Sequence, residues 1–237
     1  MRRFVLHDDL QHRVFPAGIG RGLAARMFAT VLLAFALGLV PATARAGEKV
    51  DRERVEEIIG ESCVFCHGER GEASNPVYPR LAHQNRDYLV KQLRNFRDGK
   101  RKSDIMNEQA AGLTDAEIEA LAEYFASQPP QAHPLPDDEQ EQLLYRVGEY
   151  VYKYGDGFSD IPPCASCHGK AAEGSRTLPR LAGQHRQYIV KQLKAFSRRE
   201  RTNDNAIMHS IARRLSPLAM HGVALYLSTL KPERNGR

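Results

Sequence analysis

Apolar side chains recur at intervals of three and four residues in several segments of the chain, and this spacing predicts amphipathic α-helices. Neither half of the sequence contains a convincing run of alternating apolar and polar residues, which would indicate a strand. We therefore expect an all-α protein. The apolar stripes behind this prediction are Val55, Ile58 and Ile59; Leu89, Val90, Leu93 and Phe96; Ile118, Leu121 and Phe125; and Met220, Val223 and Leu227.

Residues suited to helix capping stand ahead of three of these stripes. Asn85 is a candidate N-cap, and Thr114 with Glu117 has the pattern of a capping box. Ser216 followed by Pro217 supplies a cap and a first-turn proline. These residues predict where the three helices begin.

Two segments of the chain are near copies of each other. Residues 78–96 and 178–196 are identical at twelve of nineteen positions when aligned at an offset of 100. The chain is therefore a tandem duplication. The second copy carries an added segment, residues 139–155, which we expect to form an extra helix.

The boundary between the copies is marked by composition. Residues 127–140 contain four prolines and a run of acidic side chains, which is typical of a linker. We expect an N-terminal domain over residues 47–130, a linker over 131–138 and a C-terminal domain over 139–237.

The N-terminal residues predict a secretory signal peptide. Residues 27–40 are apolar or small and follow basic residues, but the run is shorter than the roughly 20 residues of a spanning helix. Residues 44–46 fit the small-x-small cleavage pattern. We expect residues 1–46 to be removed after Ala46, leaving a periplasmic protein that is soluble or loosely associated with the membrane. The alternatives are an uncleaved anchor and a true start downstream of Met1.

The formal net charge of +5 lies mostly in this leader, which holds six basic and two acidic side chains and so weakens a nucleic-acid interpretation. The two predicted domains differ in sign, with −4 over residues 47–130 and +5 over residues 131–237. Either this asymmetry orients the protein toward its partners, or it has no consequence. In the first case we expect Arg198, Arg199 and Arg201 to dock on an acidic partner surface.

All four cysteines occur in two copies of one pattern, CVFCHG at residues 63–68 and CASCHG at residues 164–169. CxxCH is the attachment pattern of c-type haem. Two thiols on one turn can each add to a vinyl group, and the histidine that follows can ligate the iron. Domains of this size have marginal cores, which a cofactor would enlarge. We expect two covalent haem c groups, held by Cys63, Cys66, Cys164 and Cys167, with His67 and His168 as iron ligands.

Three other interpretations of the CxxC pairs stay open at this point. A redox-active dithiol expects a βαβ context, a zinc site needs both pairs to converge on one metal, and a disulfide is the simplest use of two cysteines. Each pair has its own histidine in its own repeat, which favours haem.

A sixth iron ligand is expected from methionine, which is the distal partner in electron-carrying cytochromes c and raises the reduction potential. Met106 lies 39 residues after His67, and Met208 lies 40 residues after His168. Both methionines are expected in loops between helices. Met220 aligns with an apolar position of the first repeat and is expected in the core.

Other histidines offer weaker candidates. His209 is a competing ligand for the second haem, although its repeat equivalent is Asn107. His83 and His185 have no histidine opposite them in the other copy, and we expect both on the surface.

The repeated segments resemble the two halves of cytochrome c4, a two-haem class I cytochrome c, over nearly all of residues 50–230. They read CVFCHG, YPRLAHQ, YLVKQL and DIMNEQAAGLTDAEIEALAEYFA in the first half and CASCHG, LPRLAGQ, YIVKQL and AIMHSIARRLSP in the second. The resemblance implies two tandem all-α class I cytochrome c domains, each wrapped around one haem with histidine and methionine ligands. It also implies that the carbonyls of Pro79 and Pro179 accept a hydrogen bond from the ligating histidines, which fixes their rings.

The resemblance further implies a one-electron carrier of a periplasmic respiratory chain, between a quinol-oxidising complex and a terminal oxidase, rather than an enzyme. Its partners would be redox proteins, with peripheral membrane contact at most, and neither nucleic acid nor a small-molecule substrate. The alternative is the electron-accepting cytochrome subunit of a periplasmic dehydrogenase, such as a flavocytochrome sulfide dehydrogenase. An enzymatic haem, as in a two-haem peroxidase, needs an open iron, and a methionine in each repeat argues against it.

Overall fold

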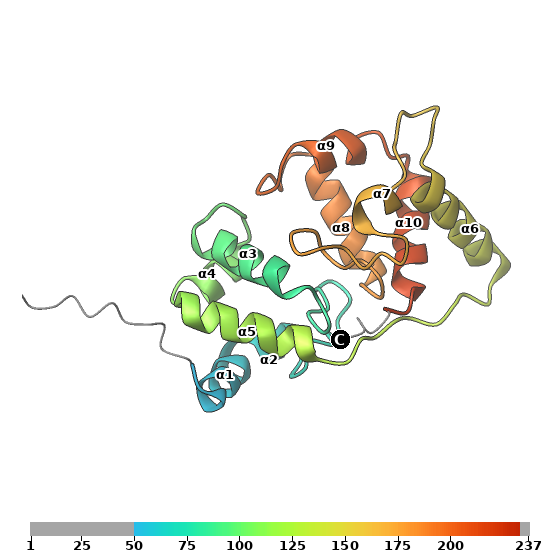
Figure 1. Cartoon of the computed structure of the whole chain (residues 1–237). Helices are drawn as coiled ribbons and strands as arrows, with labels where there is room; N and C mark the ends of the chain where they lie inside the picture. Colours follow the sequence, from blue (N-terminus) through green and yellow to red (C-terminus); the bar gives the residue numbers. More distant parts are fainter. Residues whose placement is uncertain (1–49, 233–237) are drawn as a thin grey trace, which may run out of the picture. The chain divides into compact units, whose positions relative to one another are not determined.

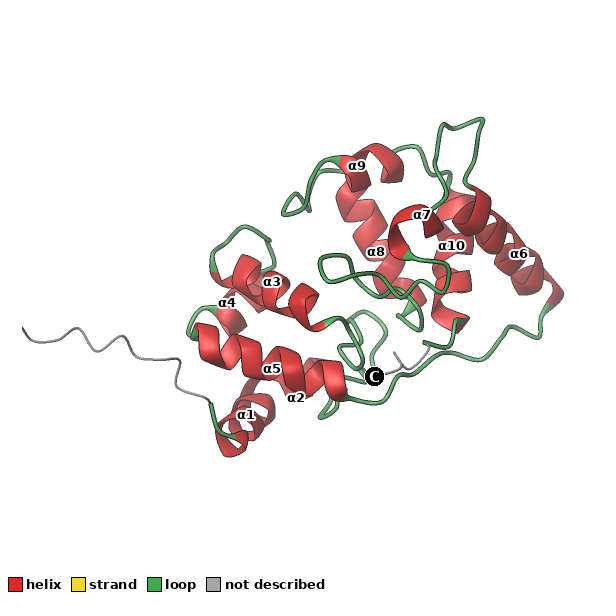
Figure 2. Cartoon of the chain, viewed as in Figure 1, coloured by secondary structure: helices red, strands yellow, loops and turns green. Residues whose placement is uncertain are grey.

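A computed structural model describes residues 50–232, so the predicted signal peptide and its cleavage site lie outside the described residues. Over that range Figure 2 shows helices joined by loops, and the β-structure consists of an isolated bridge between Asp156 and Ile161. The all-α prediction is confirmed. Within residues 50–232 no helix has the length and apolar character needed to cross a bilayer.

The helices form two sets that follow the same order (Figure 1). In the first half, residues 50–130, they are α1 (Arg52–Ile58), the π-helix η1 (Ile59–Cys63), α2 (Val64–His67), α3 (Arg86–Arg97), α4 (Asp104–Ala110) and α5 (Asp115–Ser127). In the second half, residues 131–232, they are α6 (Glu139–Tyr154), α7 (Ala165–His168), α8 (Arg186–Ser197), α9 (Ile207–Ala212) and α10 (Pro217–Thr229). Helices α2 to α5 correspond to α7 to α10.

Residues 139–155 do form a helix, α6, but the prediction that it is an addition to the second half is wrong. α6 corresponds to α1 together with η1, because each leads toward a CxxCH motif and packs against the last helix of its half. The second half instead adds a loop, residues 155–163, between α6 and α7. The sequence concealed this equivalence because the first half interrupts its helix with a π-turn, which shifts the helical register.

Two of the three predicted caps are confirmed. Thr114 and Glu117 form a reciprocal capping box at the start of α5, and Ser216 caps α10 with Pro217 in its first turn. Asn85 occupies the N-cap position of α3 but makes no capping hydrogen bond. Its Nδ2 instead donates to three backbone carbonyls of the second half, at 2.8 to 3.1 Å.

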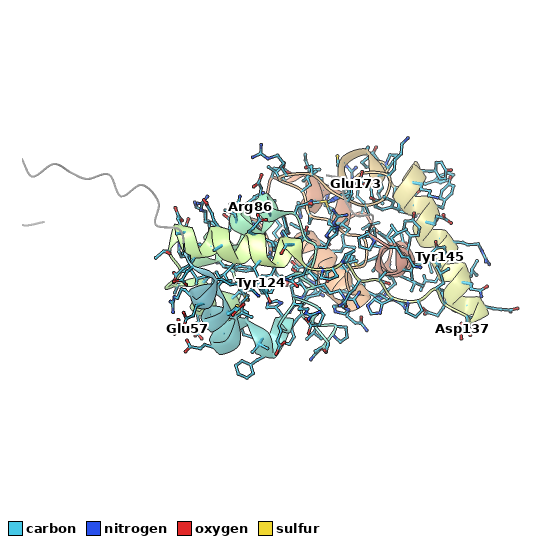
Figure 3. The ribbon with its side chains drawn as sticks, turned by 60° about the horizontal axis from the view of Figure 1, so that its bottom comes forward. Glu57, Arg86, Tyr124, Asp137, Tyr145 and Glu173 are labelled. Carbon is cyan, nitrogen blue, oxygen red and sulfur yellow. The ribbon has the colours of Figure 1, made fainter. Side chains whose placement is uncertain are left out.

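In the second half, α6 lies directly against α10. A Cβ atom on Gly148 would lie 1.9 Å from the carbonyl oxygen of Gly222, so the two backbones touch and only glycine fits. Tyr145 and Tyr152 of α6 then pack on Tyr226 of α10, with ring centroids 5.4 and 5.5 Å apart. Figure 3 labels Tyr145 on the side of α6 toward α10. The tyrosine-rich helix is therefore part of this core.

The repeated PRLAxQ segments join the two halves. Gln84 Oε1 accepts from the backbone N–H of Arg180 at 2.7 Å, and Gln84 Nε2 donates to the carbonyl of Arg180 at 2.9 Å. Gln184 makes the same pair of bonds with Arg80, at 2.8 and 3.0 Å. Both glutamines are buried. The contacts are reciprocal, as in a symmetric dimer, and the motif therefore serves the assembly of the halves.

The predicted linker, residues 131–138, is extended and lies along the second half, although the domain boundaries themselves remain predictions. The backbone N–H of His133 donates to the carbonyl of Ser228 at 2.9 Å. A Cβ atom on Gly183 would lie 1.9 Å from the carbonyl oxygen of Gln131. The linker thus explains why the second copy has glycine at the position of His83.

Candidate functional site

Each CxxCH motif lies on a short helix, α2 or α7. The four thiols are free, with Cys63, Cys66 and Cys164 partly buried and Cys167 exposed. Burial raises the pKa of Cys63 and that of Cys164 to about 11. A redox-active dithiol needs a lowered thiol pKa, so these raised values do not favour that alternative. A zinc site is not favoured either, since residues 50–232 contain no group of three or more His, Cys, Asp or Glu side chains placed to hold a metal.

The two CxxCH histidines are buried and have similar surroundings. His67 Nδ1 lies 3.0 Å from the carbonyl oxygen of Pro79, so its Nδ1–H can donate there and leave Nε2 available to a metal. Burial lowers the pKa of His67, and the bond to Pro79 partly opposes this effect. His168 has the same balance with Pro179. Its contact is looser, because His168 Nδ1 has no partner in hydrogen-bond geometry among the described residues.

The two candidate methionines occupy equivalent positions on α4 and α9, so the prediction that they lie in loops is wrong. Met106 is in the first turn of α4, where Ser103 Oγ accepts from the Met106 N–H at 3.3 Å. Met208 is the second residue of α9 and packs against the core of the second half. Both side chains are partly buried. Met220 lies in the core of α10, as predicted.

His209 and Asn107 perform the same structural task. His209 Nδ1 lies 2.9 Å from the carbonyl oxygen of Phe196 at the end of α8. Asn107 Nδ2 donates to the equivalent carbonyl of Phe96 at 2.6 Å. Each side chain ties the methionine-bearing helix to the helix before it, which gives His209 a role that does not involve iron.

Two buried arginines reach from one half to the other. Arg101 donates to the hydroxyl of Tyr188 at 3.0 Å, and Arg201 donates to that of Tyr88 at 3.0 Å. Each guanidinium also lies over a phenylalanine of its own half, 4.6 and 4.5 Å from the ring centroid. Arg201 is inaccessible to a partner, and its predicted part in docking is wrong.

The same region contains buried donors without acceptors. Gln92 Nε2 and Asn95 Nδ2 lack a hydrogen-bond partner among the described residues, while Gln92 Oε1 accepts from Arg101 at 2.7 Å. Asp204 supplies a carboxylate 3.2 Å from Arg201. Buried donors and charges are costly unless they are paired. Unpaired N–H groups beside two guanidiniums suit an anionic group, and haem carries two propionate carboxylates.

His185 is buried at the junction of the halves, so its predicted surface position is wrong. Its Nε2 lies 2.6 Å from the carbonyl oxygen of Ala73, and its Nδ1 lies 2.9 Å from Nε2 of His133. Burial, with smaller contributions from Arg80 and His133, lowers the pKa of His185 to about 4. His83, the other histidine without a counterpart in the opposite copy, is partly buried.

We expect acid to destabilise the protein through His185. Its pKa lies below the ordinary histidine value of 6.5, so the unfolded chain binds more protons between pH 6.5 and 4. The free energy of unfolding should therefore fall by up to about 3 kcal/mol as the pH drops through this window, at about 1.4 kcal/mol per pH unit. Denaturant titrations at several pH values measure this slope.

The matched variant is His185→Asn, since asparagine stands at the equivalent position 85. It should flatten the slope, whereas the control His221→Asn on α10 should keep it. An unchanged slope in His185→Asn would contradict the prediction.

Comparison with known proteins places both halves in one class. Residues 50–125 match the family model described as cytochrome C oxidase, cbb3-type, subunit III, and residues 162–231 match that of cytochrome c. The chain is 37% identical to cytochrome c4 of Thiocapsa roseopersicina over 172 residues, which cover 71% of this chain and 86% of the relative. It is also 37% identical to a thiosulfate dehydrogenase electron acceptor of Thiomonas intermedia, covering 70% of this chain and 77% of the relative.

A comparison of the fold with solved structures leads to the same classification. The crystal structure of reduced recombinant cytochrome c4 from Pseudomonas stutzeri superposes with a TM-score of 0.67 and 31% identity, covering 76% of this chain and 98% of that one. The two CxxCH segments, with Cys63 and Cys66 in one and Cys164 and Cys167 in the other, are accordingly the attachment sites of two covalent haem c groups.

Proposed function

The chain belongs to the cytochrome c4 family, and we propose that it is a periplasmic one-electron carrier between a quinol-oxidising complex and a terminal oxidase. Bound haem supplies the Fe(III)/Fe(II) exchange. The protein contributes ligation, burial and the surface met by partners. The observation that carries the proposal is that each half places one buried CxxCH histidine and one partly buried methionine at equivalent positions.

The axial ligands we assign are His67 and Met106 in the first half and His168 and Met208 in the second. The Pro79 carbonyl supports the first pair, because it orients the His67 ring with Nε2 left available. The bond from His209 to the end of α8 supports Met208 over its neighbour.

Replacing Met106 or Met208 with alanine should remove the near-infrared sulfur-to-iron band of one haem and leave that of the other. The affected haem should also fall in potential, because a thioether favours reduced iron and axial ligands govern a range of roughly 0.8 V. An optical redox titration of each purified variant measures both effects.

Met220→Leu is the control, because Met220 is buried in the core of α10 and should leave both bands in place. If Met208→Ala leaves the spectrum unchanged from that of the wild type, a group other than Met208 ligates the second iron. His209→Asn, which restores the residue type of the first repeat, would then identify or exclude His209.

A second function is favoured by one comparison. A relative at 37% identity is described as a thiosulfate dehydrogenase electron acceptor, which supports the role of a cytochrome that receives electrons from a periplasmic dehydrogenase. Reduction of the purified protein by a thiosulfate dehydrogenase with thiosulfate, compared with reduction by a quinol-oxidising complex, separates the two proposals. The faster donor at equal concentration identifies the function.

A further inference from the structure

The loop of residues 155–163 is particular to the second half and is held rigidly. Two backbone hydrogen bonds of 2.9 Å join Asp156 and Ile161. The Asp156 carboxylate accepts from the N–H of Phe158 at 3.0 Å and from the hydroxyl of Ser159 at 2.6 Å. Figure 1 shows this segment between α6 and α7 as a loop that extends beyond the helix ends. These bonds hold the backbone from which Phe158 projects.

The loop is also tied to α9. Arg214, just beyond α9, donates to the carbonyl of Asp160 at 2.8 Å and to its carboxylate at 2.6 Å. Between the loop and α9 is an open groove of about 560 Å³, lined largely by apolar side chains. The apolar lining includes Ile161, Pro162, Ile207 and Ile211.

Phe158 stands on this loop with its side chain fully exposed, at 106% of the reference area. Ile207 on the opposite side of the groove is 55% exposed. A large aromatic side chain held outward on a rigid loop loses little entropy on binding, which is the property of interface anchors. Phe158 and the groove together form a surface with the shape and polarity of a protein–protein contact.

The surface borders the second haem site in sequence on both sides. Pro162 is two residues before Cys164, and Ile207 directly precedes Met208. A protein seated on the groove therefore contacts the segments that carry the covalent attachment and the proposed distal ligand of that haem.

The opposite net charges of the two halves indicate which kind of partner would bind here. The region of residues 131–237 carries +5, whereas residues 47–130 carry −4. Arg214 lines the groove, and its neighbour in sequence, Arg213, is also exposed. An acidic partner would be attracted to this half and repelled by the other.

We propose that the groove between residues 155–163 and α9, with Phe158 beside it, is the docking site of an acidic electron-transfer protein. The partner buries Phe158 and lays acidic side chains against Arg213, since Arg214 is already bound to Asp160. One electron passes between the second haem and the partner's centre, so one is oxidised as the other is reduced. This inference rests on the proposed function as an electron carrier.

The test uses the holoprotein and plant plastocyanin, an acidic blue-copper protein, as the probe. Binding is measured by calorimetry with zinc-substituted, redox-inert plastocyanin. Transfer is measured by stopped flow, in which Cu(II) gains the electron that a ferrous haem loses. Phe158→Ala should weaken binding about tenfold or more, since burial of a phenylalanine is worth roughly that factor. Arg213→Glu should lower the association rate and its salt dependence.

Leu143→Ala is the matched control, because Leu143 is a 58% exposed apolar residue of α6 outside the groove. It should bind within about twofold of the wild type. Equal effects of Phe158→Ala and Leu143→Ala, or no binding of plastocyanin by the wild type at low salt, would overturn the docking proposal. Oxidation of both haems by ferricyanide reports separately on the carrier function, which stands if that reaction is complete.

Discussion

Replacing Cys63 and Cys66 with alanine should remove one of the two covalent haem groups and unfold much of the first half. The core there is small, consisting of nine buried apolar residues from α1, η1, α3 and α5, and Cys63 packs against it. A domain of this size is only marginally stable, and the haem is a large part of its interior. The haem count per chain, by mass and by absorbance, should fall from two to one, and circular dichroism should show lost helix.

Phe65→Ala is the control for this pair, because Phe65 lies between the two cysteines but is 83% exposed and supplies no thiol. It should retain both haem groups. A full helical signal in the Cys63→Ala, Cys66→Ala protein would show that the first half folds without its cofactor.

Replacing Gln84 and Gln184 with alanine should uncouple the two halves. Each glutamine satisfies one backbone N–H and one carbonyl of the opposite half, and all four groups belong to Arg80 and Arg180. Each buried group left without a partner costs about 1–3 kcal/mol. We therefore expect about 2–6 kcal/mol for each single variant, and a single unfolding transition should split into two in the double variant.

Urea denaturation followed at the two haem absorptions and by circular dichroism measures this coupling. Gln128→Ala is the control, since Gln128 Nε2 donates to the carbonyl of Tyr124 at 3.0 Å within the first half. Its unfolding should stay a single transition. Coincident curves for the double variant would mean that the buried arginines, rather than the glutamines, hold the halves together.

The sequence predicted the local parts of this protein well. The helical stripes, the capping box at Thr114 and the cap at Ser216 depend on residues within a few positions of each other, so the pattern carries the necessary information. The CxxCH motif is equally local, because its chemistry requires only one turn of chain. The placement of Met220 in the core followed from helical spacing.

Three of the wrong predictions, those for Asn85, His185 and Arg201, concern residues whose surroundings come from the other half. His185 and Arg201 have polar side chains, which indicate a surface position in sequence, yet both are buried at the junction. Asn85 was predicted to cap its own helix and bonds to the second half instead. A signal was present in the identity of Gln84 and Gln184 between the copies, but a repeated polar residue does not reveal whether it serves a cofactor or a contact.

The sequence by itself determined that this chain is a helical duplication with two haem attachment motifs, because helix periodicity and thioether chemistry act over one or two turns. Tertiary structure decided what the polar members of the repeat do. Four of them make hydrogen bonds across the junction to residues roughly a hundred positions away in the chain: Gln84, Gln184, Arg101 and Arg201. Their burial is possible only because each half supplies the acceptors that the other needs, and no local pattern encodes that exchange.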